Sequence, residues 1–186
     1  MPVSNNASYI PTINEFLAHW VQVDTALGAS ITVKLENGTG VTRADFQTSR
    51  DDLQTQAVAV IDALNDQEIA RGDIDLKKPA LLALLNEFNG MLDGYWSGTP
   101  YLNARPRVPG ITEGQEKFLA PMRDMFSLWG KLNLFTPLVG VTLPLTLSGG
   151  KVVQDCDAMI ENLQTAYANE ANAAQDVISS AGLGSK

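Results

Sequence analysis

The sequence predicts a mainly α-helical protein: a pseudo-symmetric bundle of about five helices with two short strands, built from an internal duplication. Residues 31–66 align with residues 141–176 at a constant offset of 110, with nine identical positions where average residue usage gives about two or three. Both segments begin with alternating apolar residues, pass through a glycine turn and end in a long helical pattern. A helical pattern with a tryptophan precedes each segment, and Trp20 and Trp129 match at offset 109.

Composition and charge narrow the class of protein. A chain of 186 residues, 45% apolar and 18% charged, is long enough for one domain with a substantial core. A formal net charge of −8 without a cluster of Lys or Arg disfavours binding to nucleic acid or to an anionic membrane surface. No apolar run reaches about 18 residues, so we expect no membrane insertion. The first residues lack the pattern of a secretory signal, so we expect a cytoplasmic location by default, with leaderless release or incorporation in a particle left open.

The single expected domain, residues 1–186, begins with a first repeat unit over about residues 12–96. Thr12 and Glu15 have the spacing of a capping box and predict a helix from Thr12 to the residue before Gly28. Residues 31–35 then alternate between apolar and polar side chains. This alternation is typical of a strand with one buried face.

Two further helices complete the first repeat unit. One is expected to begin at Thr42 and to end at Gly72, because Gly-Asp is a helix-breaking signal. Its apolar side chains, including Leu53 and Leu64, are expected to face inward. The next helix is expected to begin near Pro79, since proline suits the first turn of a helix. Its apolar surface is wide enough to predict burial on more than one side.

A connector rich in proline and glycine, residues 97–110, separates the two repeat units. It contains the one locally basic segment, residues 105–109, which reads Arg-Pro-Arg-Val-Pro. An extended, pre-ordered segment of this kind is suited to docking on another protein. We therefore predict that a protein partner binds at the connector.

The second, incomplete repeat unit spans about residues 112–181. Its first helix has a capping-box pattern, and Pro121 is expected to kink or divide it. A strand is expected over residues 141–147, at a sheet edge because Pro144 cannot donate to a ladder. The last helix is expected over about residues 151–180, with an apolar seam close to heptad spacing.

In the simplest arrangement, the long helices are antiparallel and the strands of the two repeat units pair at one end. Only the first unit is followed by a Leu-rich helix, so the last helix of the chain lacks the equivalent cover. Either the Leu-rich helix serves both units, or a second copy of the chain supplies the cover, which is the reading we favour. The expected self-association residues are Leu81, Leu85, Leu143, Leu145, Tyr167 and Ile178.

The polar residues form no recognisable catalytic pattern. A lone histidine, His19, lacks the further histidines or cysteines that would complete a metal site. Cys156 aligns with Phe46 of the other repeat, which favours a buried structural thiol over a nucleophile. Asp45 and Asp155 align with each other near helix starts, where the helix dipole and free N–H groups account for carboxylates. We therefore predict no catalytic residue, no metal site and no cofactor.

The leading functional prediction is a non-enzymatic structural or assembly protein that self-associates through helical and strand-edge contacts, as in a filament, a shell or a virion-type lattice. The alternative is a binding module with a small-molecule or peptide site between the tryptophan helices and the connector. The expected pocket residues are Trp20, Trp129, Tyr95, Trp96 and Tyr101. An enzyme would require Asp, Glu, Arg and His side chains to converge in space.

Overall fold

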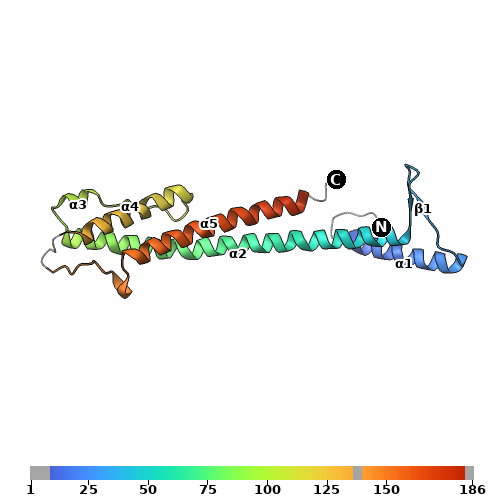
Figure 1. Ribbon diagram of the computed structural model, residues 1–186, viewed down its shortest axis with the longest axis horizontal. Coiled ribbons are helices and arrows are strands. Elements are labelled where there is room, and N and C mark those ends of the chain that lie inside the picture. Colours follow the sequence, from blue (N-terminus) through green and yellow to red (C-terminus); the bar gives the residue numbers. More distant parts are fainter. Residues whose placement is uncertain (1–8, 136–139, 183–186) are drawn as a thin grey trace. The chain divides into compact units, whose positions relative to one another are not determined.

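The computed structural model describes residues 9–135 and 140–182 and confirms the mainly helical class. The elements are, in order, α1 (Tyr9–Leu27), β1 (Val33–Lys34), β2 (Gly40–Val41), α2 (Arg43–Tyr95), α3 (Pro100–Asn103), α4 (Gln115–Asn133) and α5 (Val153–Gly182) (Figure 1). A short 3₁₀ helix, Ser148–Gly150, precedes α5. None of the helices in the two described stretches has the length and apolarity that crossing a membrane requires.

The chain divides into two compact units. Unit 1 comprises Met1–Leu64 and Asp176–Lys186, and unit 2 comprises Asn65–Gln175. The helices α2 and α5 therefore each contribute residues to both units. These units follow contacts in space, whereas the repeat units proposed above follow sequence alone, and the duplication stays a prediction.

In unit 1, α1 runs beside the first part of α2 (Figure 1). It begins at Tyr9, so the predicted start at Thr12 is one turn too late. It ends as predicted before Gly28, where φ is +62° and the amide of Ala29 donates to the carbonyl of Asp24. The carboxylate of Asp24 also accepts from the amide of Ile31 at 2.9 Å, which holds the segment after the helix against α1.

The strands β1 and β2 form one antiparallel hairpin inside unit 1, with Val33 opposite Val41. The amide of Gly38 donates to the carbonyl of Leu35 at 2.8 Å and closes the turn. Gly38 has a φ of +82°, which a residue with a Cβ adopts only under strain. The described residues thus form two short strands, and both come from the first predicted repeat unit.

The strand predicted over residues 141–147 is not formed, so the expected pairing between the two repeat units is wrong. α4 supplies the reason, because its side chains occupy the backbone groups that a ladder would use. Asn133 Oδ1 accepts from the amide of Leu145 at 2.7 Å, and Trp129 Nε1 donates to the carbonyl of Leu145 at 3.1 Å. The only β contact here is an isolated bridge between Leu147 and Lys151.

α2 continues without a break through Gly72 and Pro79, so the predicted helix end at Gly72 is wrong. A glycine inside a helix costs about 0.5–1 kcal/mol and a proline about 3 kcal/mol. Burial outweighs these costs, because each fully buried aliphatic side chain contributes roughly 1.5–3 kcal/mol. The nearby buried side chains of α2 are Ile74, Leu81, Leu84 and Leu85.

α4 likewise continues through Pro121 rather than dividing there. Proline lacks the N–H that would bond to the carbonyl four residues earlier, which belongs to Lys117. Arg107 of the connector fills this gap, since its Nη2 donates to the carbonyl of Lys117 at 2.8 Å. The connector thus supplies the donor that the helix lacks.

The core of unit 2 lies between the second part of α2, α4 and the first part of α5 (Figure 1). Phe88 of α2 packs on Trp129 of α4, with ring centroids 5.5 Å apart. Leu163 of α5 is fully buried in the same cluster. The Leu-rich part of α2 therefore covers α5 within the chain, which is the first of the two arrangements that the sequence left open.

Two polar side chains of α2 hold the connector, and the segment 111–114 that follows it, against this core. Lys78 Nζ donates to the carbonyls of Ile111 and Glu113, at 3.0 Å each, and lies 5.1 Å from the ring centroid of Phe118. Asn89 Nδ2 donates to the carbonyl of Pro106 at 3.1 Å. The connector is therefore a second cover over unit 2, in addition to the helices.

Candidate functional site

An apolar pocket of about 310 Å³ lies in unit 1. α1 provides one wall, the β1–β2 hairpin provides a second, and the start of α2 provides a third. No charged side chain lines it. The lining residues are Thr12, Ile13, Phe16, Trp20, Val33, Leu35, Val41 and Phe46.

Three aromatic rings lie next to one another in the lining of this pocket. The ring of Phe16 meets those of Trp20 and Phe46 edge to face, with centroid distances of 5.5 Å and 5.1 Å. Trp20 is buried, whereas Phe16 keeps 43% of its surface exposed. Aromatic pairs favour such edge-to-face contacts because the positive ring edge meets the negative ring face. The cluster therefore offers both ring edges and ring faces to an incoming apolar group.

A second candidate surface is a row of apolar side chains on α2 that unit 1 leaves half-exposed. Leu53 is 45% exposed, Ile61 57% and Leu64 45%. Part of this row lines a groove of about 500 Å³, which also includes residues from the start of α1 and the end of α5. In the part of unit 1 that the structure describes, Trp20 and Ala63 are the only buried apolar residues.

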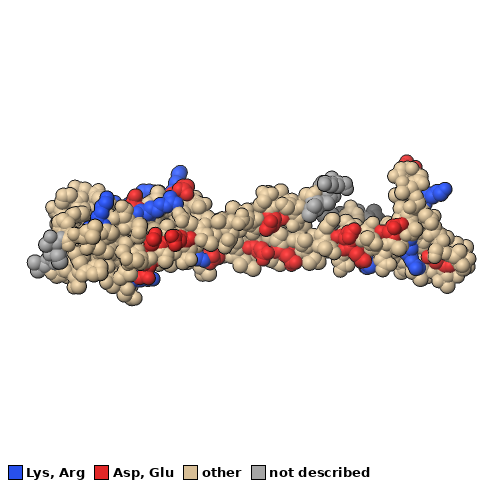
Figure 2. Space-filling model, viewed as in Figure 1, with Lys and Arg blue, Asp and Glu red and all other residues tan. Residues whose placement is uncertain are grey.

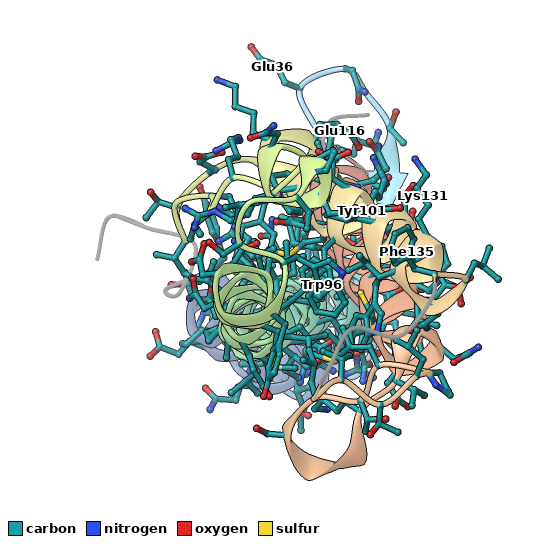
Figure 3. All side chains as sticks on the ribbon, turned by 90° about the vertical axis from the view of Figure 1, so that its left-hand side faces the viewer. Glu36, Trp96, Tyr101, Glu116, Lys131 and Phe135 are labelled. Atoms are coloured by element: carbon teal, nitrogen blue, oxygen red, sulfur yellow. The ribbon has the colours of Figure 1, made fainter. Side chains whose placement is uncertain are left out.

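The five aromatic residues predicted to line a pocket belong to different units, with Trp20 in unit 1 and the other four in unit 2. Trp20 belongs to the unit 1 cluster, while Trp96 and Trp129 are buried in the core of unit 2, where a ligand has no access to their rings. Tyr101 packs edge to face on Phe135, with ring centroids 5.0 Å apart (Figure 3). Tyr95 is about half-exposed. In unit 1, Trp20 lines a pocket together with Phe16 and Phe46, two residues that the sequence analysis did not name for a pocket.

The residues predicted for self-association lie mostly in the interior. Leu81, Leu85 and Leu145 are buried in the core of unit 2, so the expectation that they await a neighbouring copy is wrong. Leu143 and Tyr167 are partly buried against the same core. Ile178 alone of the six is well exposed, at 64%. The same chain covers these leucines, because α4 and α5 share one hydrophobic core with α2.

The exposed row on α2 was missed for the opposite reason. Its residues have the helical spacing of an inward-facing stripe, and Leu53 and Leu64 were assigned to the interior on that signal. Spacing alone shows that a helix has an apolar face, but it does not show whether another helix covers that face.

The two aligned carboxylates act as helix caps, as predicted. Asp45 accepts from the amide and hydroxyl of Thr42, and the Thr42 hydroxyl accepts from the amide of Asp45. The Thr42 side-chain hydrogen bond, with the Thr42 amide bond, lowers the pKa of Asp45. Asp155 accepts from the amide of Val152 at 2.8 Å at the start of α5.

Cys156 is buried, as predicted for a structural thiol. Burial, with a smaller contribution from the charge of Asp157, raises the pKa of its thiol to about 12, so the reactive thiolate is scarce at neutral pH. His19 is exposed on α1. Across residues 9–135 and 140–182, no group of three or more His, Cys, Asp and Glu side chains has the geometry to hold a metal ion.

The basic residues of the connector are paired within unit 2. Arg105 forms two hydrogen bonds with the carboxylate of Asp93, at 2.8 Å and 2.9 Å. Arg107 pairs with both carboxylate oxygens of Glu113, at 2.7 Å and 3.0 Å. The Arg107 hydrogen bonds, with the amide of Gly110, lower the pKa of Glu113 to about 2. Docking of a protein partner at the connector stays a prediction, and it would compete with these pairs.

Comparison of the chain with protein-family models, with curated protein sequences and with solved structures gives no match. The surfaces of unit 1 and the internal contacts of unit 2 are therefore the observations that bear on function.

Proposed function

We propose that this protein is a non-enzymatic structural protein that self-associates through unit 1. The observation that carries the proposal is the half-exposed apolar row on α2, formed by Leu53, Ile61 and Leu64. Removing such side chains from water is favourable by roughly 25 cal/mol for each Å² of apolar surface. A continuous apolar row on a long helix is therefore a surface that gains stability when another helix covers it.

A second copy of the chain is the proposed cover. In unit 2, the long helix α5 is packed against α2 and α4, and its Leu163 is fully buried. Leu53 is the residue that aligns with Leu163 in the proposed duplication, and it is half-exposed. If the two repeats share an ancestry, the part of α2 around Leu53 corresponds to the part of α5 around Leu163. That part of α5 is covered by more neighbouring helices than α1 provides for α2. Two copies can satisfy each other by placing their rows face to face.

The titratable residues support a non-enzymatic role. Asp45 and Asp155 are engaged at helix starts, and Glu113 is paired with Arg107. The thiol of Cys156 is buried with a raised pKa. Each of these side chains has a structural task, and general acid–base catalysis instead requires groups poised for proton transfer in a cleft.

The symmetry of the contact decides the form of the assembly. A face-to-face contact related by a two-fold axis closes a dimer, whereas a head-to-tail contact continues into a filament or lattice. The predicted strand-edge route is weaker than the helical one, because β1 and β2 have two residues each.

Sedimentation and light scattering over a range of protein concentrations test the proposal. We expect the wild-type chain to associate, and we expect Leu53→Glu combined with Ile61→Glu to weaken association at least tenfold while the helical circular dichroism is retained. Gln54→Glu is the matched control, because it adds a carboxylate at an exposed position in the same turn. A wild-type chain that stays monomeric at every concentration, or an equal loss in the Gln54→Glu control, contradicts the proposal.

Salt provides an independent check. Acidic groups are spaced along α2 (Figure 2), and Asp51, Asp52 and Asp62 lie beside the apolar row in sequence. Two copies meeting along this row bring like charges together, and salt screens their repulsion. We therefore expect association to strengthen with ionic strength.

A binding role has one specific observation in its favour, the aromatic pocket of unit 1. It lies elsewhere than the predicted site, and it is independent of the row on α2.

A further inference from the structure

We propose that the pocket between α1, the β1–β2 hairpin and the start of α2 binds a small, uncharged aromatic molecule. The proposal rests on the size of the pocket, the chemistry of its lining and the contacts that hold its walls together. It does not depend on self-association.

The size of the pocket limits the ligand. Its volume of about 310 Å³ is at the lower end of the roughly 300–1,000 Å³ range of small-molecule sites. This volume suits one ring or two fused rings. A peptide helix, which is about 10 Å across with its side chains, does not fit inside it.

The lining selects for an uncharged and apolar molecule. Seven of the eight lining residues are apolar, and the eighth, Thr12, carries a hydroxyl. A charged group buried here would have no charged partner in the lining, and that burial is strongly unfavourable.

The three aromatic side chains of the lining favour a ligand that contains an aromatic ring. Phe16 is inclined at 75° to Trp20 and at 61° to Phe46, so the cluster presents edges and faces in different directions. An aromatic ligand extends this edge-to-face pattern, whereas an aliphatic ligand of the same volume gains only contact area. The half-exposed side chains of Phe16 and Leu35 mark the open side of the pocket.

The walls are tied together by specific contacts. Asp24 of α1 pairs with Arg43 of α2 at 3.3 Å and accepts from the amide of Ile31, just before β1. Arg50 Nη1 donates to Asn14 Oδ1 at 2.9 Å and joins the same two helices. These bonds position α1, α2 and the hairpin before a ligand arrives, and a preformed pocket loses less conformational entropy on binding.

Titration of the full chain with indole, followed by amide and methyl chemical shifts, tests the proposal. We expect saturable shifts that are concentrated on α1, the hairpin and the start of α2. Indole-3-carboxylate, the charged counterpart, should bind at least tenfold more weakly. Absence of saturable shifts, or saturable shifts only outside these segments, overturns the proposal.

Two variants locate the site. Val41→Phe should fill the pocket and weaken indole binding at least tenfold, and Val58→Phe is the matched control on an exposed face of α2. Equal binding by the two variants overturns the proposal. If Val41→Phe loses its fold, Leu35→Glu replaces it, since this residue is 49% exposed at the rim and tolerates a polar head. Val58→Glu, at a position of α2 that is 50% exposed and outside the pocket, is then the control.

Another occupant gives a distinct signature. If a second copy of the chain fills the pocket, the shifts on the pocket residues appear on raising the protein concentration without indole, and indole does not add to them. That result overturns the small-molecule proposal. Shifts that require indole at constant protein concentration support it.

Discussion

The two units of this molecule bury their helices to very different extents. In unit 2, α2, α4 and α5 share one core that contains Phe88, Trp129 and Leu163. Within the described part of unit 1, only Trp20 and Ala63 are buried among the apolar residues. Yet α2 runs through both units as a single helix. The same element is therefore a core helix in one unit and a half-covered helix in the other.

This difference shows that the apolar content of a helix does not by itself bury its side chains. Burial depends on how much of the helix the neighbouring elements cover. In unit 2, α2 meets two helices, and the connector with the segment 111–114 adds a further cover through Lys78 and Asn89. In unit 1, α1, the two-stranded hairpin and the end of α5 leave the apolar row of α2 half-exposed. The residual apolar surface there is where we place both self-association and ligand binding.

The largest change in stability is expected at one of two aligned leucines, Leu163 in unit 2 and Leu53 in unit 1. Leu163→Asp should unfold unit 2, because an unpartnered carboxylate in the core costs several kcal/mol out of a total stability of about 5–15 kcal/mol. Leu53→Asp, at the aligned and half-exposed position, should change stability by less than about 1 kcal/mol. Chemical denaturation with residue-resolved hydrogen exchange measures both. Similar losses in the two variants would show that unit 1 depends on its leucines as much as unit 2 does.

The next largest effect is expected when the hydrogen bonds of Lys78, which hold the segment after the connector against unit 2, are removed. Lys78→Met removes the charged donor that binds the carbonyls of Ile111 and Glu113, and a hydrogen bond to a charged group contributes about 1.5–3 kcal/mol. Lys77→Met is the matched control, since its more exposed pair with Asp73 contributes at most about 1 kcal/mol. Urea denaturation midpoints give the two values, and equal midpoints would contradict a role for Lys78 as a fastener.

A smaller effect tests whether Arg107 compensates for Pro121. Arg107→Met should destabilise unit 2 by about 1 kcal/mol in the natural chain, because the carbonyl of Lys117 loses its donor. The loss should shrink by about 0.5 kcal/mol or more when Pro121→Ala restores an N–H to α4. A double-mutant cycle by thermal denaturation measures this coupling. Arg105→Met serves as the control, because Arg105 pairs with Asp93 of α2 rather than with a carbonyl of α4.

The smallest effect is a pH dependence at the same connector. The pKa of Glu113 is lowered from 4.5 to about 2 in the folded chain by Arg107 and Gly110. Its contribution to stability is therefore fully present above the unfolded pKa and is lost as the pH falls from about 4.5 towards 2. The difference in Tm between the natural chain and Glu113→Gln should shrink over this window. A difference that stays constant down to pH 2 would exclude the ion pair as its source.

Several parts of the fold follow from local sequence patterns. The capping residues Asp45 and Asp155 and the helix end at Gly28 depend on hydrogen bonds within a few residues, and all three were predicted correctly. Burial of Cys156 and Leu163 followed from their place on one face of a helix. These features need little information beyond one helix turn.

Other parts depend on elements that are distant in sequence. Gly72 and Pro79 read locally as a break, but the core around Leu81 and Leu85 keeps α2 continuous. Residues 141–147 alternate like a strand, but Asn133 and Trp129 capture the backbone at Leu145. A local signal of about 1–3 kcal/mol is outweighed when distant side chains supply more.

The sequence by itself determined the helical class, the caps and the apolar face of each helix, because these depend on residues within one or two turns of each other. The tertiary structure alone decided which part of α2 is covered, where the hairpin forms and that Trp20 borders a pocket with Phe16 and Phe46. The physical reason is that burial is a property of two surfaces that meet. A single helix encodes only one of those surfaces.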